Sequence, residues 1–242
     1  MSAPLVLGPR AGAKAVLPLG AAVGIFGVTF GVLAEDAGIG GVASIVFGVT
    51  TFAGSSQFAA AGVLSAGGTV TAAIIAALLL NARYVPIGIS VAHAIDGPWW
   101  RRLAKAQLVV DESWAVGNLG GGRYDGGRLL GAGLVLYVAW ITGTTIGVLA
   151  GDVIGDPETL GLDAAFPALF LALLIGQIDS RGALVAAAAG AAIAFALVPL
   201  VPPGVPIIAA SVACLLGLRA TAATGAMAVP DEGDTTPGGG PP

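Results

Sequence analysis

Long apolar stretches alternate with short polar turns along most of this chain. A helix needs about 20 apolar residues to cross the hydrocarbon layer of a bilayer. Seven stretches come close to that length, and they cover residues 15–34, 41–64, 70–92, 129–150, 164–178, 182–199 and 206–218. The gaps between them are rich in Gly, Pro, Ser and Asp, which favour turns. The pattern predicts an all-α fold, a multi-spanning transmembrane helical bundle of about 7–8 membrane segments, with 103–119 as the ambiguous eighth.

Polar residues mark the two ends of this predicted bundle. Arg10 and Lys14 precede the first apolar stretch, and positive residues beside a span favour the cytoplasmic side. We therefore expect residues 1–13 to be a cytoplasmic N-terminal segment and residues 14–221 to be the transmembrane domain. Residues 222–242 are polar and rich in Gly and Pro, a composition that predicts a disordered tail.

Five further cations surround the ambiguous stretch: Arg101, Arg102, Lys105, Arg123 and Arg128. If the first three stretches all cross and residues 103–119 lie flat, these cations fall outside, against the positive-inside rule. Two arrangements return cations to the inside: 103–119 crosses, or the second apolar stretch folds back as a re-entrant segment. Both remain open, and we favour a membrane-embedded position for 103–119.

Composition supports a lipid-facing surface. Hydrophobic residues make up 56% of the 242 residues, charged residues only 10%, and the mean hydropathy is +0.93. A soluble domain carries about a quarter charged residues, so this chain lacks the means to cover itself for water. Its 39 glycines suit close helix packing in a membrane. The net charge is −4, and the sequence shows no basic patch that would indicate nucleic-acid binding.

The first polar cluster inside an apolar stretch is Gly54, Ser55, Ser56 and Gln57. Three consecutive polar side chains spread over about 300° of a helix, so they cannot share one protein-facing stripe. Irregular backbone at membrane depth is tolerated where it lines protein or a cavity, and broken helices hold substrates in many transporters. The alternative is an unbroken helix whose polar side chains hydrogen-bond to its neighbours. We predict a broken helix near residues 54–57 that contributes to a substrate site.

The second cluster, in the third stretch, contains Asn81, Arg83 and Tyr84. Pro86 has no amide hydrogen, so we expect the Ala82 carbonyl to be a free acceptor. Arg83 stays charged at any ordinary pH and therefore needs a carboxylate or an anionic ligand group. A structural ion pair and a substrate contact remain open alternatives. We predict Asn81, Arg83 and Tyr84 as substrate-binding residues.

The third cluster lies in the ambiguous stretch. Gln107, Asp111, Trp114 and Asn118 recur at helical spacing, so we expect them to form one stripe. Adjacent carboxylates raise each other's pKa, which suits a proton carrier. We therefore predict Asp111 and Glu112 as proton-coupling residues. The alternative is an amphipathic interfacial helix with a solvated polar face; we favour embedding because the intramembrane arginine needs a carboxylate partner.

Catalytic and metal-binding patterns are missing from the sequence. There is no Walker loop and no HExxH, and the single His93 has no second histidine with which to build a metal site. The single Cys214 excludes a disulfide within the chain. We expect neither an enzyme nor a cofactor.

At these clusters the sequence resembles the AzlC family, over about residues 17–218. Residues 52–58, Phe-Ala-Gly-Ser-Ser-Gln-Phe, are similar to a family pattern of aromatic-Ala-Gly-small-Ser-Gln-Phe. Arg83-Tyr84 is similar to the family's Arg followed by His or Tyr, and Asp111-Glu112 and Pro167-Ala168-Leu169-Phe170 also match in order and spacing. Many relatives carry Asp where this chain has Asn81.

The resemblance implies an exporter of Leu, Ile and Val, and in some cases Met, in the bacterial cytoplasmic membrane. Together with the acidic pair Asp111-Glu112, it leads to the hypothesis of a secondary transporter that uses the proton gradient. It also implies a small, separately encoded AzlD-type membrane subunit as partner. Three other functions stay open from the residues alone: transport of another small solute such as an organic anion, a non-transporting membrane assembly subunit, and a pore-type channel.

Overall fold

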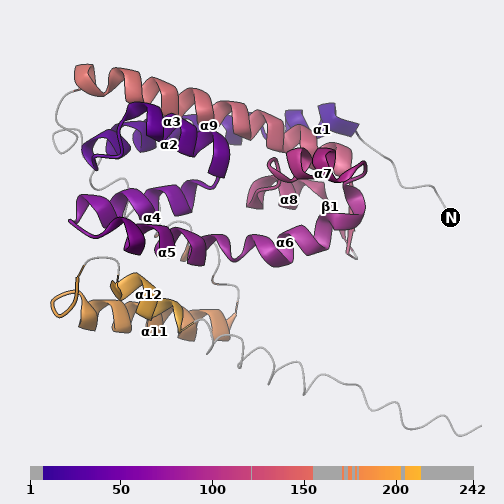
Figure 1. Ribbon diagram of the computed structural model, residues 1–242. Coiled ribbons are helices and arrows are strands. Elements are labelled where there is room, and N and C mark those ends of the chain that lie inside the picture. The colour runs from indigo at the N-terminus through magenta and orange to yellow at the C-terminus, as the bar shows by residue number, and fades with distance from the viewer. Residues whose placement is uncertain are drawn as a thin grey trace, which may run out of the picture.

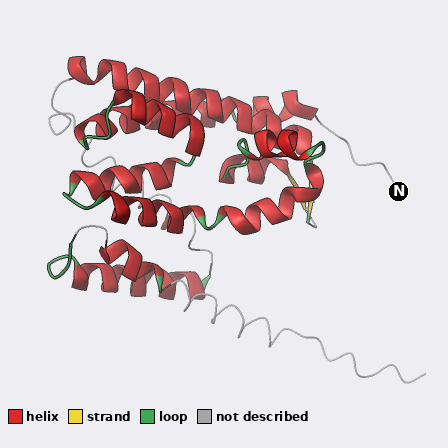
Figure 2. Ribbon diagram, viewed as in Figure 1, coloured by secondary structure: helices red, strands yellow, loops and turns green. Residues whose placement is uncertain are grey.

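The computed structural model describes residues 8–120, 122–154, 180–202 and 205–213, with 171, 174, 175 and 178 between them. Helices make up nearly all of this part, and loops are short (Figure 2). The helical elements are α1 (Gly8–Ala15), α2 (Leu17–Asp36), α3 (Gly41–Thr51), α4 (Gly54–Ser65), α5 (Val70–Asn81), α6 (Tyr84–Val91), η1 (Ala92–Ala94), α7 (Trp99–Ala106), α8 (Asp111–Gly117), α9 (Gly126–Ile154), α11 (Arg181–Leu197) and α12 (Val205–Ser211). A short antiparallel hairpin joins β1 (Asn118–Gly120) to β2 (Arg123–Tyr124).

Three helices among the described residues are long and apolar enough to cross a membrane: Leu17–Asp36, Val70–Ala94 and Gly126–Gly151. The all-α membrane class agrees with the sequence prediction, but the count of seven to eight spans is not confirmed. Most of the predicted stretch 164–178 and the tail 222–242 lie outside the described residues.

Glycines bring α2 and α9 into close, parallel contact. A Cβ at Gly27 would lie 2.7 Å from the Trp140 carbonyl oxygen, and one at Gly31 would meet the carbonyl of Thr144. Membrane helices associate through such small residues because lipid gives no hydrophobic drive for helix pairing. The core beside this contact is aromatic, with Phe30 stacked on Trp140 at 5.6 Å between ring centroids.

The second apolar stretch does not cross the bundle. Its helix is broken after Thr51, where Phe52 takes a left-handed backbone conformation with φ of 40°. In Figure 1, α3 runs toward the middle of the bundle and α4 runs back to the same end. The sequence prediction of a broken helix near residues 54–57 is thus confirmed, with the break at 52–53 and Gly54 as the first helical residue of α4.

A second pair, α7 and α8, folds back from the opposite end (Figure 1). The turn at residues 107–110 interrupts the ambiguous stretch, and the amide of Val110 donates to the Ser113 hydroxyl at 2.9 Å to start a new helix. The predicted single stripe of Gln107, Asp111, Trp114 and Asn118 is therefore wrong. Gln107 follows α7, Asp111 opens α8, and Asn118 belongs to β1.

The two fold-back pairs meet beside the middle of α9. Tyr137 of α9 contacts Phe52 with 5.0 Å between ring centroids, and a Cβ at Gly133 of the same helix would meet the Leu108 carbonyl. The second of the two arrangements considered from sequence, a re-entrant second stretch, is the one observed, and residues 103–119 fold back as well.

This topology gathers the cations at one end of the bundle. In Figure 1, α1, α7, the β-hairpin and the start of α9 lie at the same end. We call it the cationic end, and it carries Arg10, Lys14, Arg101, Arg102, Lys105, Arg123 and Arg128. The end of α2, with Glu35 and Asp36, and the loop from α2 to α3 lie at the other end.

Candidate functional site

The site is built around the break between α3 and α4. The first amides of a helix lack intrahelical partners, and within the described residues no side chain caps α4. Two polar side chains instead hold the break together: the Ser56 hydroxyl donates to the Ala53 carbonyl at 2.8 Å, and the Ala53 amide donates to Gln57 Oε1 at 3.3 Å. Ser56 and Gln57 are fully buried, so their direct role is to fix the shape of the break.

Arg83 connects this break to the start of α8. Its Nη2 donates to the Ser55 hydroxyl at 2.8 Å and lies 2.9 Å from Asp111 Oδ2. The predicted need of Arg83 for a carboxylate is thus met by Asp111. About 38% of the Arg83 side chain and 37% of the Asp111 side chain remain exposed, so the ion pair faces an open space and contributes less than the about 3–5 kcal/mol typical of breaking a fully buried pair.

The backbone around Arg83 stays close to helical. Ala82 and Arg83 keep right-handed helical angles between α5 and α6, and the Ala82 carbonyl accepts a hydrogen bond from the Val85 amide at 3.1 Å. The prediction that this carbonyl is a free acceptor is wrong. A three-residue turn replaces the bond that Pro86 removes.

A cavity of about 210 Å³ opens at the ion pair, beside the middle of α9. Its polar lining comes from the starts of α4, α6 and α8: Gly54, Ser55, Arg83, Tyr84, Asp111 and Glu112. Its apolar lining comes mainly from α2 and α9: Leu19, Val23, Phe26, Phe52, Phe58, Val110, Leu136 and Trp140. This volume is below the roughly 300–1,000 Å³ of pockets for drug-sized ligands, so the cavity suits a small amphipathic solute.

Six of the nine residues predicted for the site line this cavity. The other three are Ser56, Gln57 and Asn81, which lie outside its lining. Gln57 Nε2 and Asn81 Oδ1 are buried without a hydrogen-bond partner among the described residues. The wall residues Leu136 and Trp140 were not identified from the sequence, because they carry no polar signal along an apolar helix.

Glu112 and Asp111 have different surroundings although they are neighbours. Asp111 pairs with Arg83, whereas Glu112 forms no ion pair within the part of the chain that the structure describes. Both side chains line the cavity from the first turn of α8. The described residues include no cluster of three His, Cys, Asp or Glu that could hold a metal ion.

Fold and cavity together define a helical membrane protein with a small internal site on broken helices. A family model described as AzlC protein matches residues 18–154, a stretch that includes every residue lining the cavity. The chain belongs to the AzlC family.

Several relatives are named as membrane proteins. The chain is 34% identical to an "Uncharacterized membrane protein" of Archaeoglobus fulgidus over 76% of its own length and 82% of that protein. It is 27% identical to the "Branched-chain amino acid transport protein AzlC" of Bacillus subtilis, over 66% of this chain and 64% of that protein. It is 28% identical to the "Inner membrane protein YgaZ" of Escherichia coli, over 66% and 69% respectively. No solved structure matches the chain.

Proposed function

We propose that this protein is a secondary transporter that exports the branched-chain amino acids Leu, Ile and Val, with Met as a further substrate. The observation that carries the proposal is the cavity in which Ser55, Arg83 and Asp111 meet beside an apolar wall. A Bacillus subtilis relative named for branched-chain amino acid transport supports the choice of substrate.

The two halves of the cavity suit the two halves of such a substrate. The Arg83 guanidinium has five N–H donors, and its contacts with Ser55, Tyr84 and Asp111 all use Nη2. Its other donors, and the uncapped start of α4, favour a carboxylate. The ammonium group would lie near the carboxylates of Asp111 and Glu112, and the aliphatic side chain against Phe52, Phe58 and Trp140.

We assign proton coupling to Glu112. Asp111 already neutralises Arg83 at 2.9 Å, so protonating it would leave a cation uncompensated. Glu112 lines the same cavity and neutralises no cation among the described residues. A carboxylate that changes charge beside the substrate ammonium links the proton gradient to substrate binding. Ser56, Gln57 and Asn81, predicted from sequence as substrate-binding, would act by holding the helix starts in place.

Orientation follows from the cationic end. Seven of the chain's ten Lys and Arg residues lie there, and cations favour the cytoplasmic side. We therefore place this end, with the N-terminus, in the cytoplasm of a bacterial cell and the bundle in its inner membrane. Exposed large apolar side chains, such as Ile25, Val42 and Ile89, would face lipid or a small AzlD-type subunit.

Uptake into proteoliposomes tests the proposal. Purified protein, with and without a co-expressed AzlD-type subunit, is reconstituted and given labelled leucine under an imposed pH gradient. We expect saturable leucine flux that unlabelled valine and isoleucine inhibit and lactate does not. Lactate flux without leucine flux would instead support the organic-anion alternative, which the guanidinium of Arg83 motivates. Absence of any flux in both preparations would favour the assembly subunit.

A further inference from the structure

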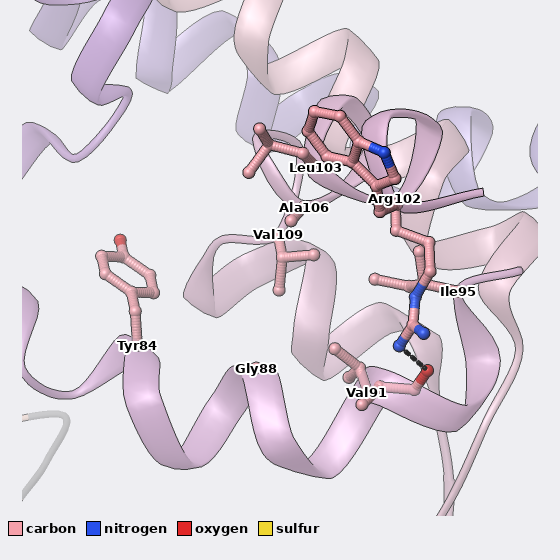
Figure 3. Close-up of a pocket in the computed structure, with 10 residues that line it drawn as sticks. Tyr84, Gly88, Val91, Ile95, Arg102, Leu103, Ala106 and Val109 are labelled. Carbon is pink, nitrogen blue, oxygen red and sulfur yellow. Dashed lines mark hydrogen bonds between the residues drawn. The ribbon is translucent and has the colours of Figure 1, made fainter. Parts of the chain in front are cut away.

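A second cavity lies between α6 and α7, outside the site described above. Its volume is about 540 Å³, larger than that of the central cavity. Figure 3 shows it bounded by α6 below and by Leu103, Ala106 and Val109 above. The space lies toward the cationic end, because α7 and the end of α6 both belong to that part of the bundle (Figure 1).

Tyr84 contributes to the linings of both cavities, and among the described residues it alone does so. The close-up shows its ring at one side of the second cavity (Figure 3). On the central side the Arg83 guanidinium carbon lies 5.2 Å from the centre of this ring, and Arg83 Nη2 donates to the Tyr84 hydroxyl at 3.4 Å. One side chain therefore separates the ion pair from the larger space.

The walls of the second cavity, like those of the central one, combine apolar side chains with a guanidinium. Most of the lining is aliphatic, including Val91, Ile95 and Leu103, and one cation is present, Arg102. One of its N–H groups donates to the Ala92 carbonyl at 3.2 Å, which holds the guanidinium over the end of α6 (Figure 3). Arg102 forms no ion pair with any described residue, so a carboxylate group can approach it.

Gly88 keeps this space open. A Cβ built at Gly88 would meet no atom within 4 Å, and the residue lies on the α6 side of the cavity, one helical turn from Tyr84 (Figure 3). A large side chain at this position would fill the cavity. Ile89, the next residue, is 72% exposed and lies outside the lining.

We propose that the cavity between α6 and α7 is the passage by which a small zwitterion with an aliphatic side chain moves between the central cavity and the cationic end. Tyr84 forms the partition that must move, and Arg102 receives the carboxylate on the way. This inference rests on the proposed transport function.

Two matched tryptophan variants test the passage. Gly88→Trp fills the cavity, whereas Ile89→Trp adds the same ring on the exposed side of α6. In proteoliposomes we expect Gly88→Trp to lower labelled-leucine flux by about tenfold or more, a loss equivalent to about 1.4 kcal/mol, and Ile89→Trp to transport like the unchanged protein. Equal flux in the two variants, with the unchanged protein active, would overturn the passage and leave the proposed function intact. An inactive unchanged protein would refute the function itself.

A chemical measurement covers the case in which Gly88→Trp fails to fold. Gly88→Cys is made in a Cys214→Ser chain and treated with a membrane-impermeant methanethiosulfonate reagent applied at the cationic end. We expect labelling that slows when leucine is added, because the solute occupies the same space. Ile89→Cys, on the exposed apolar side of α6 that faces lipid or the partner subunit, is the control and should not be labelled, because the reagent stays in water. A Gly88→Cys thiol that the reagent never reaches, as when a lipid chain fills the cavity, overturns the inference, as does labelling unaffected by leucine.

Discussion

Gln107 donates its side-chain amide to the carbonyl of Thr50 at 3.0 Å, which joins the turn between α7 and α8 to the end of α3. The same nitrogen lies 3.1 Å from the Val49 carbonyl. Helix-end carbonyls need such partners, and here the partner comes from the fold-back pair that enters from the opposite end. One side chain thus couples the two interrupted segments that surround the cavity.

Replacing Gln107 by Leu should therefore destabilise the junction. The Thr50 carbonyl, which is exposed, would lose its side-chain partner, and an ordinary hydrogen bond of this kind contributes about 0.5–1.5 kcal/mol. Tyr137→Phe is the informative comparison, since the Tyr137 hydroxyl also donates to the Val49 carbonyl, at 2.9 Å. We expect a smaller loss of stability from Tyr137→Phe, because the Val49 carbonyl still accepts a hydrogen bond from Gln107. Thermal unfolding in detergent measures both, and a larger shift for Tyr137→Phe would contradict this account.

Arg83 should tolerate neither loss of charge nor a change in shape. Arg83→Gln removes a charge-assisted contact worth about 1.5–3 kcal/mol, so we expect labelled-leucine flux to fall about 10- to 100-fold. Arg83→Lys should also transport poorly, because a single ammonium lacks the planar fork of donors.

The matched control for Arg83 is Arg181→Gln. Arg181 opens α11, is exposed and lies outside the cavity lining. Labelled-leucine flux in the Arg181→Gln variant should equal that of the unchanged protein. Wild-type flux in Arg83→Gln would remove Arg83 from the substrate site and leave it as a structural ion pair.

Much of the site could be predicted from sequence because intramembrane charge is costly. Arg83 at the centre of an apolar stretch required an acid, and Asp111 was one of the few available. The break near Gly54 was also visible, since three consecutive polar residues do not fit one helical face. These inferences depend on the chemistry of residues close together in the chain, which a single sequence shows.

The topology could not be predicted in the same way. The stretch 103–119 has helical spacing of polar residues, yet the chain turns at residues 107–110 because Ser113 caps a new helix at Val110. Hydropathy alone does not distinguish a crossing from a fold-back pair, since both bury apolar residues. The position of the wall residue Trp140 depends on packing against Phe30 and Phe58 from two other helices, which the sequence alone does not show.

The glycine contact between α2 and α9 gives a stability prediction. Gly27→Ala places a methyl group 2.7 Å from the Trp140 carbonyl oxygen, so the helices must separate. Overpacking of this kind costs about 1–3 kcal/mol, and we expect the Tm in detergent to fall by several degrees. Gly24→Ala is the matched control on the same helix, because its Cβ would lie at an ordinary 3.7 Å from the Ala139 carbonyl oxygen. Similar Tm values for the two variants would show that the contact at Gly27 is relaxed.

Glu112 provides the test of proton coupling. Glu112→Gln keeps the size and hydrogen-bonding capacity of the side chain but cannot gain or lose a proton, so leucine flux should persist while its dependence on an imposed pH gradient disappears. Asp111→Asn should behave differently: it leaves the Arg83 cation without its partner at 2.9 Å, and both flux and Tm should fall. Asp36→Asn, on an exposed residue at the end of α2, serves as the control and should retain full gradient dependence. Leucine flux should be measured in each variant with and without the gradient at one fixed external pH. A Glu112→Gln protein whose flux still follows the gradient would move the proton site away from this carboxylate.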